Sequence, residues 1–429
     1  MLTPGVYFRE VYMISIYIHI PFCIKKCAYC DFLSFPSDDE TIQRYVDCLC
    51  NEIGGCEADD RNVATIFFGG GTPSILGADQ IEQLMAKIKS EFNIIESAEI
   101  SMECNPGTVT EEKLKGFLSA GINRLSIGLQ SANDNELKNL GRIHNYEQFL
   151  FTYNTARKVG FKNINIDLMS ALPGQTIDSF RESLTNVVGL KPQHLSAYSL
   201  IIEEDTEFWG LYGDDKSVKS GDENLAKLPD EDAERAMYYL TKEVLDRFGY
   251  HRYEISNYAL PGYECEHNKV YWTGGDYISF GIGAASFYKG VRYNNISDVT
   301  RYLEIWSDDK VAQKGEEVGI ELVVTDKDIF DVKESGVFLL KNKLCHTDIC
   351  QLTDKDLMEE YMFVGLRMME GVSISGFENR FGISMNEVYC DIIKKYTKDD
   401  YLMIEGDRLM LTKKGIDVSN VILADFLLD

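Results

Sequence analysis

Long hydrophobic runs, proline and positive charge are all scarce in this chain of 429 residues. No apolar run reaches the roughly 18 residues that a membrane-spanning helix needs, so no such helix is expected. The sequence has 9 prolines and no low-complexity tract, and 45% of its residues are hydrophobic. This composition favours packed globular structure over disorder.

Basic residues are outnumbered by acidic ones: the chain has 43 Lys and Arg and 69 Asp and Glu, which gives a net charge of −26. Such a charge disfavours non-specific binding to nucleic acid or anionic lipid, although it leaves room for a local basic patch. The first residues lack the layout of a signal peptide, since Arg9 and Glu10 interrupt them. We therefore expect a cytoplasmic protein without a transmembrane segment, which reaches a membrane only through a partner.

Cysteine, in contrast, is abundant. The chain has 11 cysteines, and an odd number in a reducing compartment does not indicate a disulfide framework. Three of them form a C-x3-C-x2-C cluster at Cys23, Cys27 and Cys30. The other eight are expected to be small buried hydrophobic residues.

Apolar runs rich in β-formers alternate with helix-like segments from residue 15 to about 250. The expected strands are 15–20, 65–68, 99–104, 124–128, 163–169 and 194–202, and the expected helices are 40–50, 80–92, 111–120, 146–159, 177–188 and 231–248. This alternation predicts an α/β fold with a parallel sheet, and six units suit a partial (β/α)6 barrel. Polar and glycine-rich segments follow the strand ends, where such sheets bind ligands.

Three regions are expected: a barrel core at 1–250, a middle region at 251–345 and a C-terminal domain at 346–429. Residues 205–230 within the core are expected to be a polar loop. In the last region, helices at 356–369, 375–381 and 386–395 precede a hairpin with a Gly406-Asp407 turn. That order is typical of an α+β winged-helix-like domain. The segment is not notably basic, so no nucleic-acid partner is expected.

The spacing of the cysteine cluster indicates its chemistry. A structural zinc site normally has four protein ligands, and neither a second C-x2-C nor a histidine pair follows closely. Three thiolates suit a [4Fe-4S] cluster with one open iron, and zinc stays the alternative. C-x3-C-x2-C on the first βα loop resembles the radical S-adenosylmethionine (SAM) family. The resemblance implies that SAM binds the open iron and is cleaved to a 5′-deoxyadenosyl radical.

A second set of residues follows the next strand ends. The run Gly69–Pro73 alone marks a tight turn, but at this position it resembles the GGGTP loop of the family, which lies against SAM. Polar side chains past the following strands need partners, and the ribose, carboxylate and sulfonium of SAM supply them. Each could instead be a structural ion pair. The expected SAM contacts are Tyr17, Tyr29, Gly70, Gly71, Thr72, Glu103, Gln130, Arg142 and Asp167.

Longer segments resemble one branch of this family, which holds the oxygen-independent coproporphyrinogen III oxidases and the HemW heme chaperones. They are SIYIHIPFCIKKCAYCDF, FFGGGTPSIL, ECNPGTV, RLSIGLQS, LGRIHN, IDLMSALPGQT and YEISNYALPGYECEHNKVYW. Two features separate the two groups near the cluster. Phe32 stands where the oxidase pattern has a fourth cysteine, and 22 residues precede Cys23, where the oxidases have a long extension.

His267 is the third discriminator, because HNKVYW matches the HNxxYW pattern of HemW, whose histidine is associated with heme binding. A neutral imidazole is a common axial ligand of heme iron, and Tyr271 and Trp272 can stack on a porphyrin. A hydrogen-bonded histidine in an aromatic core is the alternative interpretation.

Two functions of different classes follow from the resemblance. A heme chaperone would bind heme, carry the SAM-coordinated cluster and deliver heme to acceptors such as respiratory heme proteins, with no residue assigned a catalytic role. The alternative is an enzyme that converts coproporphyrinogen III to protoporphyrinogen IX by oxidative decarboxylation. Either one needs an electron donor. Phe32 and His267 favour the chaperone.

Overall fold

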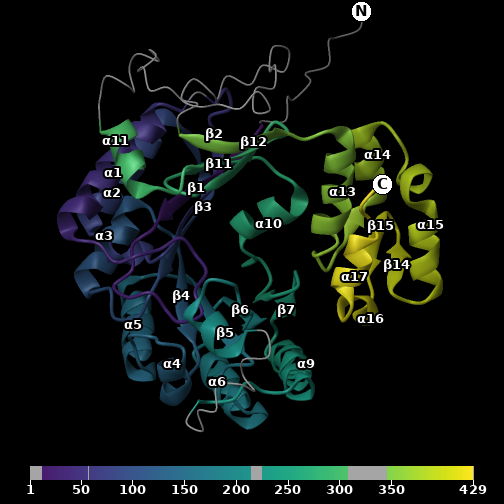
Figure 1. The fold of residues 1–429 in the computed structure, drawn as a ribbon, viewed down its shortest axis with the longest axis horizontal. Coiled ribbons are helices and arrows are strands. Elements are labelled where there is room, and N and C mark those ends of the chain that lie inside the picture. Colours follow the sequence, from purple (N-terminus) through teal and green to yellow (C-terminus); the bar gives the residue numbers. More distant parts are fainter. Residues whose placement is uncertain (1–11, 57, 214–224, 308–344, 429) are drawn as a thin grey trace, which may run out of the picture.

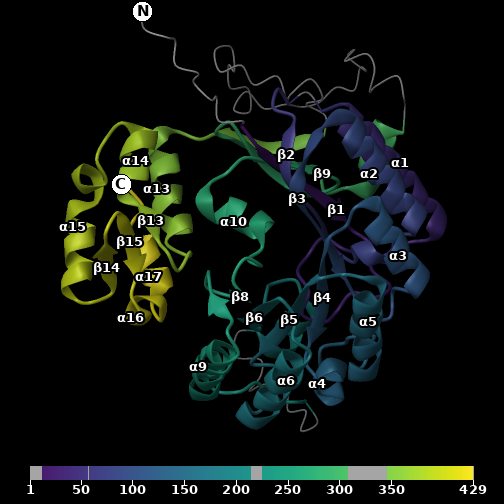
Figure 2. The ribbon, with the colours of Figure 1, turned by 180° about the vertical axis from the view of Figure 1, so that it is seen from behind.

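The structure is a computed structural model that describes residues 12–56, 58–213, 225–307 and 345–428. Its main feature is a curved sheet of 12 strands in the order β12-β11-β10-β9-β1-β2-β3-β4-β5-β6-β8-β7. Helices α1 to α6 cover the outer face of the sheet, and the C-terminal unit lies across from its open side (Figures 1 and 2). Among the described helices, none is long and apolar enough to cross a membrane.

Six parallel strands form the middle of the sheet and neighbour one another in chain order, as the alternation predicts. They are β1 (Ile14–Ile20), β2 (Asn62–Gly70), β3 (Asn93–Cys104), β4 (Arg124–Gln130), β5 (Asn163–Ser170) and β6 (His194–Ser199). The connecting and following helices are α1 (Asp39–Gly54), α2 (Ala78–Glu91), α3 (Glu111–Ala120), α4 (Asp134–Asn139), α5 (Tyr146–Val159), α6 (Ile177–Gly189) and α9 (Glu231–Arg247). The predicted partial barrel is confirmed.

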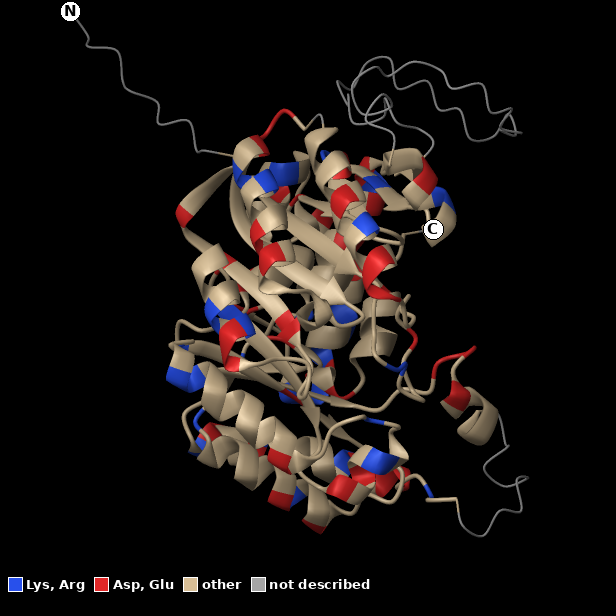
Figure 3. Cartoon of the chain, turned by 90° about the vertical axis from the view of Figure 1, so that its left-hand side faces the viewer, with Lys and Arg blue, Asp and Glu red and all other residues tan. Residues whose placement is uncertain are grey.

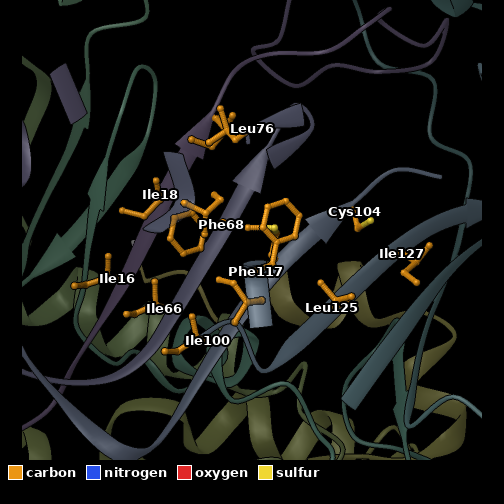
Figure 4. Close-up of a cluster of buried hydrophobic side chains, with 14 of the residues drawn as sticks. Ile16, Ile18, Ile66, Phe68, Leu76, Ile100, Cys104, Phe117, Leu125 and Ile127 are labelled. Atoms are coloured by element: carbon orange, nitrogen blue, oxygen red, sulfur yellow. The ribbon is translucent and has the colours of Figure 1, made fainter. Parts of the chain in front are cut away.

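The two faces of the sheet differ in polarity, because alternate residues of a strand point to opposite sides. The four isoleucines of β1 are at most 1% exposed and pack beneath the helices with Phe68 and Leu76 (Figure 4). Ser15, Tyr17 and His19 alternate with them and face the inside of the barrel. The outer face therefore supplies the apolar core, and the inner face is left for polar side chains.

Local capping residues fix the ends of several helices. Thr110 accepts a hydrogen bond from the backbone N–H of Lys113 (3.2 Å) at the start of α3, and Gly121, with φ of 115°, ends that helix. Asn145 and Gln148 cap α5 reciprocally. Because these signals are local, α3 and α5 begin and end at the predicted residues.

The expected loop at 205–230 is wrong in part, since Glu207–Tyr212 forms helix α7. Thr206 caps this helix by accepting from the N–H of Trp209 (3.1 Å), and Phe208 is buried against the segment around Ala28. Packing against the barrel overrides the polar composition of the segment. Residues 214–224 of that expected loop lie outside the described residues.

The alternation stops after residue 250, but the sheet continues. One edge gains β7 (His251–Arg252) and β8 (Asn257–Ala259), and the other gains β9 (Tyr277–Phe280), β10 (Ala285–Tyr288), β11 (Val291–Asn295) and β12 (His346–Gln351). β9 pairs in parallel with β1, and β10 to β12 are antiparallel. Helices α10 (Glu266–Thr273) and α11 (Val299–Trp306) accompany them. Of the expected middle region, residues 308–344 lie outside the described residues.

A buried carboxylate joins this extension to α1. Glu52 accepts hydrogen bonds from the hydroxyl of Tyr302 (2.6 Å), the backbone N–H of Gly281 (2.8 Å) and the side-chain amide of Asn295 (2.7 Å). Burial raises the pKa of Glu52 to about 7, and these three donors oppose the rise. The extension is therefore fixed to the barrel by a specific polar contact.

The C-terminal unit has its own apolar core, which includes Leu366, Phe377, Tyr389 and Leu409. Its elements are α13 (Asp354–Gly365), β13 (Val372–Ser373), α14 (Ile374–Phe381), α15 (Met385–Lys398), β14 (Leu402–Glu405), β15 (Arg408–Leu411), α16 (Lys413–Ile416) and α17 (Ser419–Ala424). The predicted helices and hairpin occur in the predicted order, except that the helix expected at 356–369 ends at Gly365. Figure 3 shows the opposite side of the molecule, where acidic and basic residues are interspersed over the helices that cover the barrel.

Candidate functional site

The loop that carries Cys23, Cys27 and Cys30 follows β1 and is tied to the barrel through its backbone. The N–H of Cys23 donates to the carbonyl of Phe35 (3.0 Å), and the N–H of Ala28 donates to the carbonyl of Leu140 (3.2 Å). Cys23 is buried, and the other two cysteines are half-buried. The loop therefore holds three free thiols in fixed positions at the carboxyl edge of the sheet.

These thiols line a cavity at the strand ends whose empty volume, including its mouth, is about 730 Å³. The structure brings eight of the expected SAM residues to the same cavity: Tyr29, Gly70, Gly71, Thr72, Glu103, Gln130, Arg142 and Asp167. Tyr17 is outside this lining, and its hydroxyl lies 3.2 Å from Nδ1 of His19. The strand-end reasoning thus assembles one site from residues far apart in the sequence.

The glycine run brings bare backbone close to the cysteine loop. A methyl group at Gly71 would lie 2.8 Å from the carbonyl oxygen of Phe22 and 3.1 Å from Sγ of Cys23. Gly70 has φ of 114°, and its N–H donates to the carboxylate of Glu103 (3.1 Å). Only glycine permits this approach, so the run is more than a tight turn.

Arg142 connects the cysteine loop with two strand ends. One guanidinium nitrogen donates to the side chain of Asn105 and to the carbonyl of Gly128, both at 2.7 Å, and the other lies 3.5 Å from Sγ of Cys27. Arg142 therefore ties the cysteine loop to the ends of β3 and β4.

Two carboxylates face the same cavity. Burial raises the pKa of Glu103 to about 8, and the charge of Asp167 adds to the rise. Burial also raises the pKa of Asp167, although Asn165 donates to it at 2.7 Å and Ser126 at 3.3 Å. A pair of buried carboxyl groups with raised pKa values is typical of a site that receives a cation.

Gln130 ends β4 in a strained conformation. Its φ is 72°, in the left-handed region, at an irregularity of the β4–β5 pairing. The residue is buried, and its side-chain oxygen accepts a hydrogen bond from the hydroxyl of Tyr198 (3.4 Å). A strained non-glycine residue in a cavity wall is a sign of function.

Sequence reasoning missed several further lining residues, among them Asn105, Ser126 and Tyr198. Asn105 directly follows β3 and donates to the hydroxyl of Thr72 (2.7 Å), so its place at a strand end was the available signal. Ser126 and Tyr198 lie within strands, where only the alternation between inner and outer faces could have indicated them.

His267 lies on α10, inside the barrel, and is 1% exposed. Its Nδ1 is 2.7 Å from the hydroxyl of Thr65, its Nε2 is 2.9 Å from the hydroxyl of Tyr271, and its ring stacks on Phe67 with centroids 5.1 Å apart. Burial lowers the pKa of His267 to about 3, so the ring is neutral. In this conformation neither ring nitrogen is free for heme iron.

Glu99 on β3 fixes the first turn of α10 from inside the barrel. Its carboxylate accepts hydrogen bonds from the backbone N–H groups of Glu266 and His267, both at 3.3 Å, and from the thiol of Cys265 at 3.4 Å. Arg124, which is 2% exposed, lies 3.8 Å from the same carboxylate. A buried ion pair thus caps the helix that carries His267.

Comparison with known proteins agrees with this geometry. The model of the radical SAM superfamily matches residues 17–187, and that of the HemN C-terminal domain matches residues 352–418. The heme chaperone HemW of Lactococcus lactis is 34% identical over 415 residues, which cover 97% of each chain. The chain belongs to the HemW family. Within it, the Bacillus subtilis member is 32% identical over 418 residues, 97% of this chain and 99% of that one.

The fold is shared more widely than the HemW family. The solved structure of coproporphyrinogen III oxidase from Escherichia coli, a radical SAM enzyme, aligns with a TM-score of 0.75 over 97% of this chain and 90% of that one. The two sequences are 24% identical, so the likeness establishes the fold alone.

Phe32 distinguishes the site of this HemW family member from the oxidase pattern. It lines the cavity and is 67% exposed, although it is a large apolar side chain. No thiol stands at that position, so the cysteine loop offers three sulfur ligands.

The cavity fits the [4Fe-4S] cluster and the SAM that a radical SAM domain implies. Nε of Arg142 is buried without a hydrogen-bond partner among the described residues, and the backbone at Gly71 leaves space that a side chain would fill. Cys23, Cys27 and Cys30 would hold the cluster, and Glu103 and Asp167 would face SAM. When bound, the two cofactors would supply a 5′-deoxyadenosyl radical.

Proposed function

We propose that this chain binds heme, carries a SAM-coordinated [4Fe-4S] cluster and delivers heme to acceptor proteins. The observation that carries the proposal is the likeness to the Lactococcus lactis heme chaperone HemW, at 34% identity over 97% of both chains. Phe32, in place of a fourth cysteine, supports it. The partners are heme, heme-accepting proteins such as respiratory heme proteins, and an electron donor.

The proposal extends to the division of the chain. Residues 1–250 hold the cluster and SAM, residues 251–345 hold the heme-associated segment, and residues 346–429 form the C-terminal domain. The separate apolar core around Phe377 supports the last boundary. For His267 the proposed role is limited to a state in which α10 has left the barrel, because both ring nitrogens are engaged here.

A paired assay tests this function. The reconstituted chain is expected to bind heme with a Soret band, because a carrier must hold its cargo. It is also expected to leave coproporphyrinogen III unchanged when SAM, a reductant and an electron acceptor are supplied. Repeated turnover to protoporphyrinogen IX without heme binding would assign the chain to the oxidases instead.

The SAM contacts give a second expected result. Glu103→Gln and Asp167→Asn keep the size of each side chain but remove its charge, so each is expected to weaken SAM binding ten- to a hundredfold, or about 1.5–3 kcal/mol. Iron content is expected to stay unchanged. Isothermal titration with SAM measures the effect, and Glu82→Gln on the exposed side of α2 is the matched control. Equal affinity in all three variants would make these carboxylates structural.

SAM binding is also expected to depend on pH. Burial raises the pKa of Glu103 to about 8, so the carboxyl group is mostly protonated below that pH. The cationic cofactor favours the ionised form, so SAM affinity is expected to rise as the pH increases from about 6 through 8. In Glu103→Gln this rise should shrink, whereas a wild-type affinity that is flat over the same range would contradict the assignment.

The raised pKa of Glu103 also affects the stability of the folded chain when SAM is absent. An unfolded Glu ionises near its ordinary pKa of about 4.5, whereas Glu103 in the folded chain keeps its proton up to about 8. The folded state therefore binds more protons between these values. Its stability is expected to fall as the pH rises through this window, and thermal unfolding of wild type and Glu103→Gln measures the difference.

A further inference from the structure

A second cavity lies where the end of α10 meets the C-terminal unit. Tyr271 and Trp272 of α10, Tyr277 of β9 and Tyr361 of α13 are among the residues that line it. Its empty volume, including the open mouth, is about 680 Å³. The part of this space that water-sized molecules can occupy is about 210 Å³. Pockets for whole drug-sized ligands span about 300–1,000 Å³, so this cavity accommodates only the edge of a large flat molecule.

The walls of this cavity are mainly aromatic. The rings of Tyr271 and Tyr277 meet edge to face with centroids 4.7 Å apart, and Phe287 follows at 6.4 Å from Tyr277. Nε1 of Trp272 is buried without a hydrogen-bond partner among the described residues. Such walls favour a planar apolar ring system, which can stack on the faces and edges of the aromatic side chains.

The rim of the cavity carries two arginines in different states. Arg292 is neutralised by a two-point ion pair with Glu360, at 2.7 and 3.0 Å. Arg380 is exposed and lies against Gly274, and within the described ranges no salt bridge joins it to a carboxylate. In a chain with a net charge of −26, an arginine without such a partner at an aromatic cavity selects for an acidic ligand.

We propose that this cavity is the heme site of the described conformation, with the ring edge between the aromatic side chains and a propionate on Arg380. The inference rests on the proposed function, which makes heme the cargo. It gives the end of α10 the binding role and leaves His267 as the residue that holds the helix to Thr65 from inside the barrel. In this site the protein recognises the porphyrin ring and a propionate carboxylate of heme. The heme iron contributes little to the binding affinity.

Three probes separate this site from ligation by His267: heme, metal-free protoporphyrin IX and the dimethyl ester of protoporphyrin IX. In the cluster-loaded chain, heme and metal-free protoporphyrin are expected to bind with similar affinity in absorbance titrations. Arg380→Glu is expected to weaken both about tenfold and to leave the dimethyl ester unchanged, because the ester has no carboxylate. Lys398→Glu, with the same charge change on an exposed site of α15, is the control and should change nothing.

A filling variant tests the cavity without relying on charge. Val364, on α13, is half-buried in the cavity wall, and Val364→Trp is expected to weaken all three probes while the cluster content stays at the wild-type level. Wild-type affinity for heme in both Arg380→Glu and Val364→Trp would overturn the site. The site would also be overturned if the wild-type chain strongly preferred heme over metal-free protoporphyrin and His267→Ala removed that preference. If the wild-type chain binds no heme at all, the proposed function fails first.

Discussion

A variant with Cys23, Cys27 and Cys30 all replaced by alanine is expected to take up no [4Fe-4S] cluster. The unaltered chain is expected to bind about four iron and four sulfide per chain after anaerobic reconstitution. The three thiols share one cavity with Arg142, whose charge lies 3.5 Å from Sγ of Cys27. Among the described lining residues only Cys104 would then offer a thiol, and burial raises its pKa to about 12, which keeps it protonated. A single thiol cannot hold the cluster, so the loss should be complete.

A cysteine outside the cavity supplies the control. Cys50, on α1, is half-buried like Cys27, and burial raises the pKa of its thiol to about 11, which keeps it protonated. Cys50→Ala is therefore expected to retain full iron and the broad visible absorption that Cys27→Ala loses. A full cluster in the triple variant, or equal loss in Cys50→Ala, would contradict the assignment.

Replacing Glu99 by alanine is expected to lower the free energy of unfolding by about 3–5 kcal/mol. The change leaves the guanidinium of Arg124 buried at 2% exposure, with no other ion-pair partner in the described part of the chain. It also removes the acceptor for the backbone N–H groups of Glu266 and His267 at the start of α10. Both losses follow from the removal of one carboxylate. The decrease in unfolding free energy should therefore exceed that of an ordinary surface substitution.

Denaturant unfolding followed by circular dichroism measures this loss. Glu96→Ala is the matched control, because Glu96 lies on the same strand and its side chain is exposed. Its unfolding free energy is expected to stay within about 0.5 kcal/mol of wild type. Should Glu99→Ala prove as stable as Glu96→Ala, the ion pair with Arg124 would not be what secures α10.

Sequence periodicity predicted the barrel well because its determinants are local. The strands alternate apolar and polar residues, and caps such as Thr110 and Asn145 stand at the helix starts. The same reasoning placed Glu103 and Asp167 in one site, since the carboxyl ends of parallel strands meet at one edge. Strand position, together with the resemblance of the motifs, was enough to find most of the cavity.

The remaining features depend on contacts between distant segments, which periodicity does not encode. Glu99 and Cys265 are far apart in the sequence. Nothing local therefore indicates that Glu99 caps α10, the helix that follows Cys265. The polar composition around Phe208 gives no sign of its packing on Ala28. For His267 the sequence left two interpretations open, a heme ligand and a hydrogen-bonded core residue, and only the packing on Phe67 shows that its ring lies inside the barrel in this conformation.

The pairing of β1 has a consequence for how the chain is made. Its Ser15 pairs with Tyr277 of β9, so one edge of the strand has no native partner until most of the chain has left the ribosome. Parallel pairing over such a separation is slow, and an open strand edge invites association with other chains. The cysteine loop follows this same strand. We therefore expect the cluster to be inserted after synthesis is complete, into a barrel that β9 has already closed against β1.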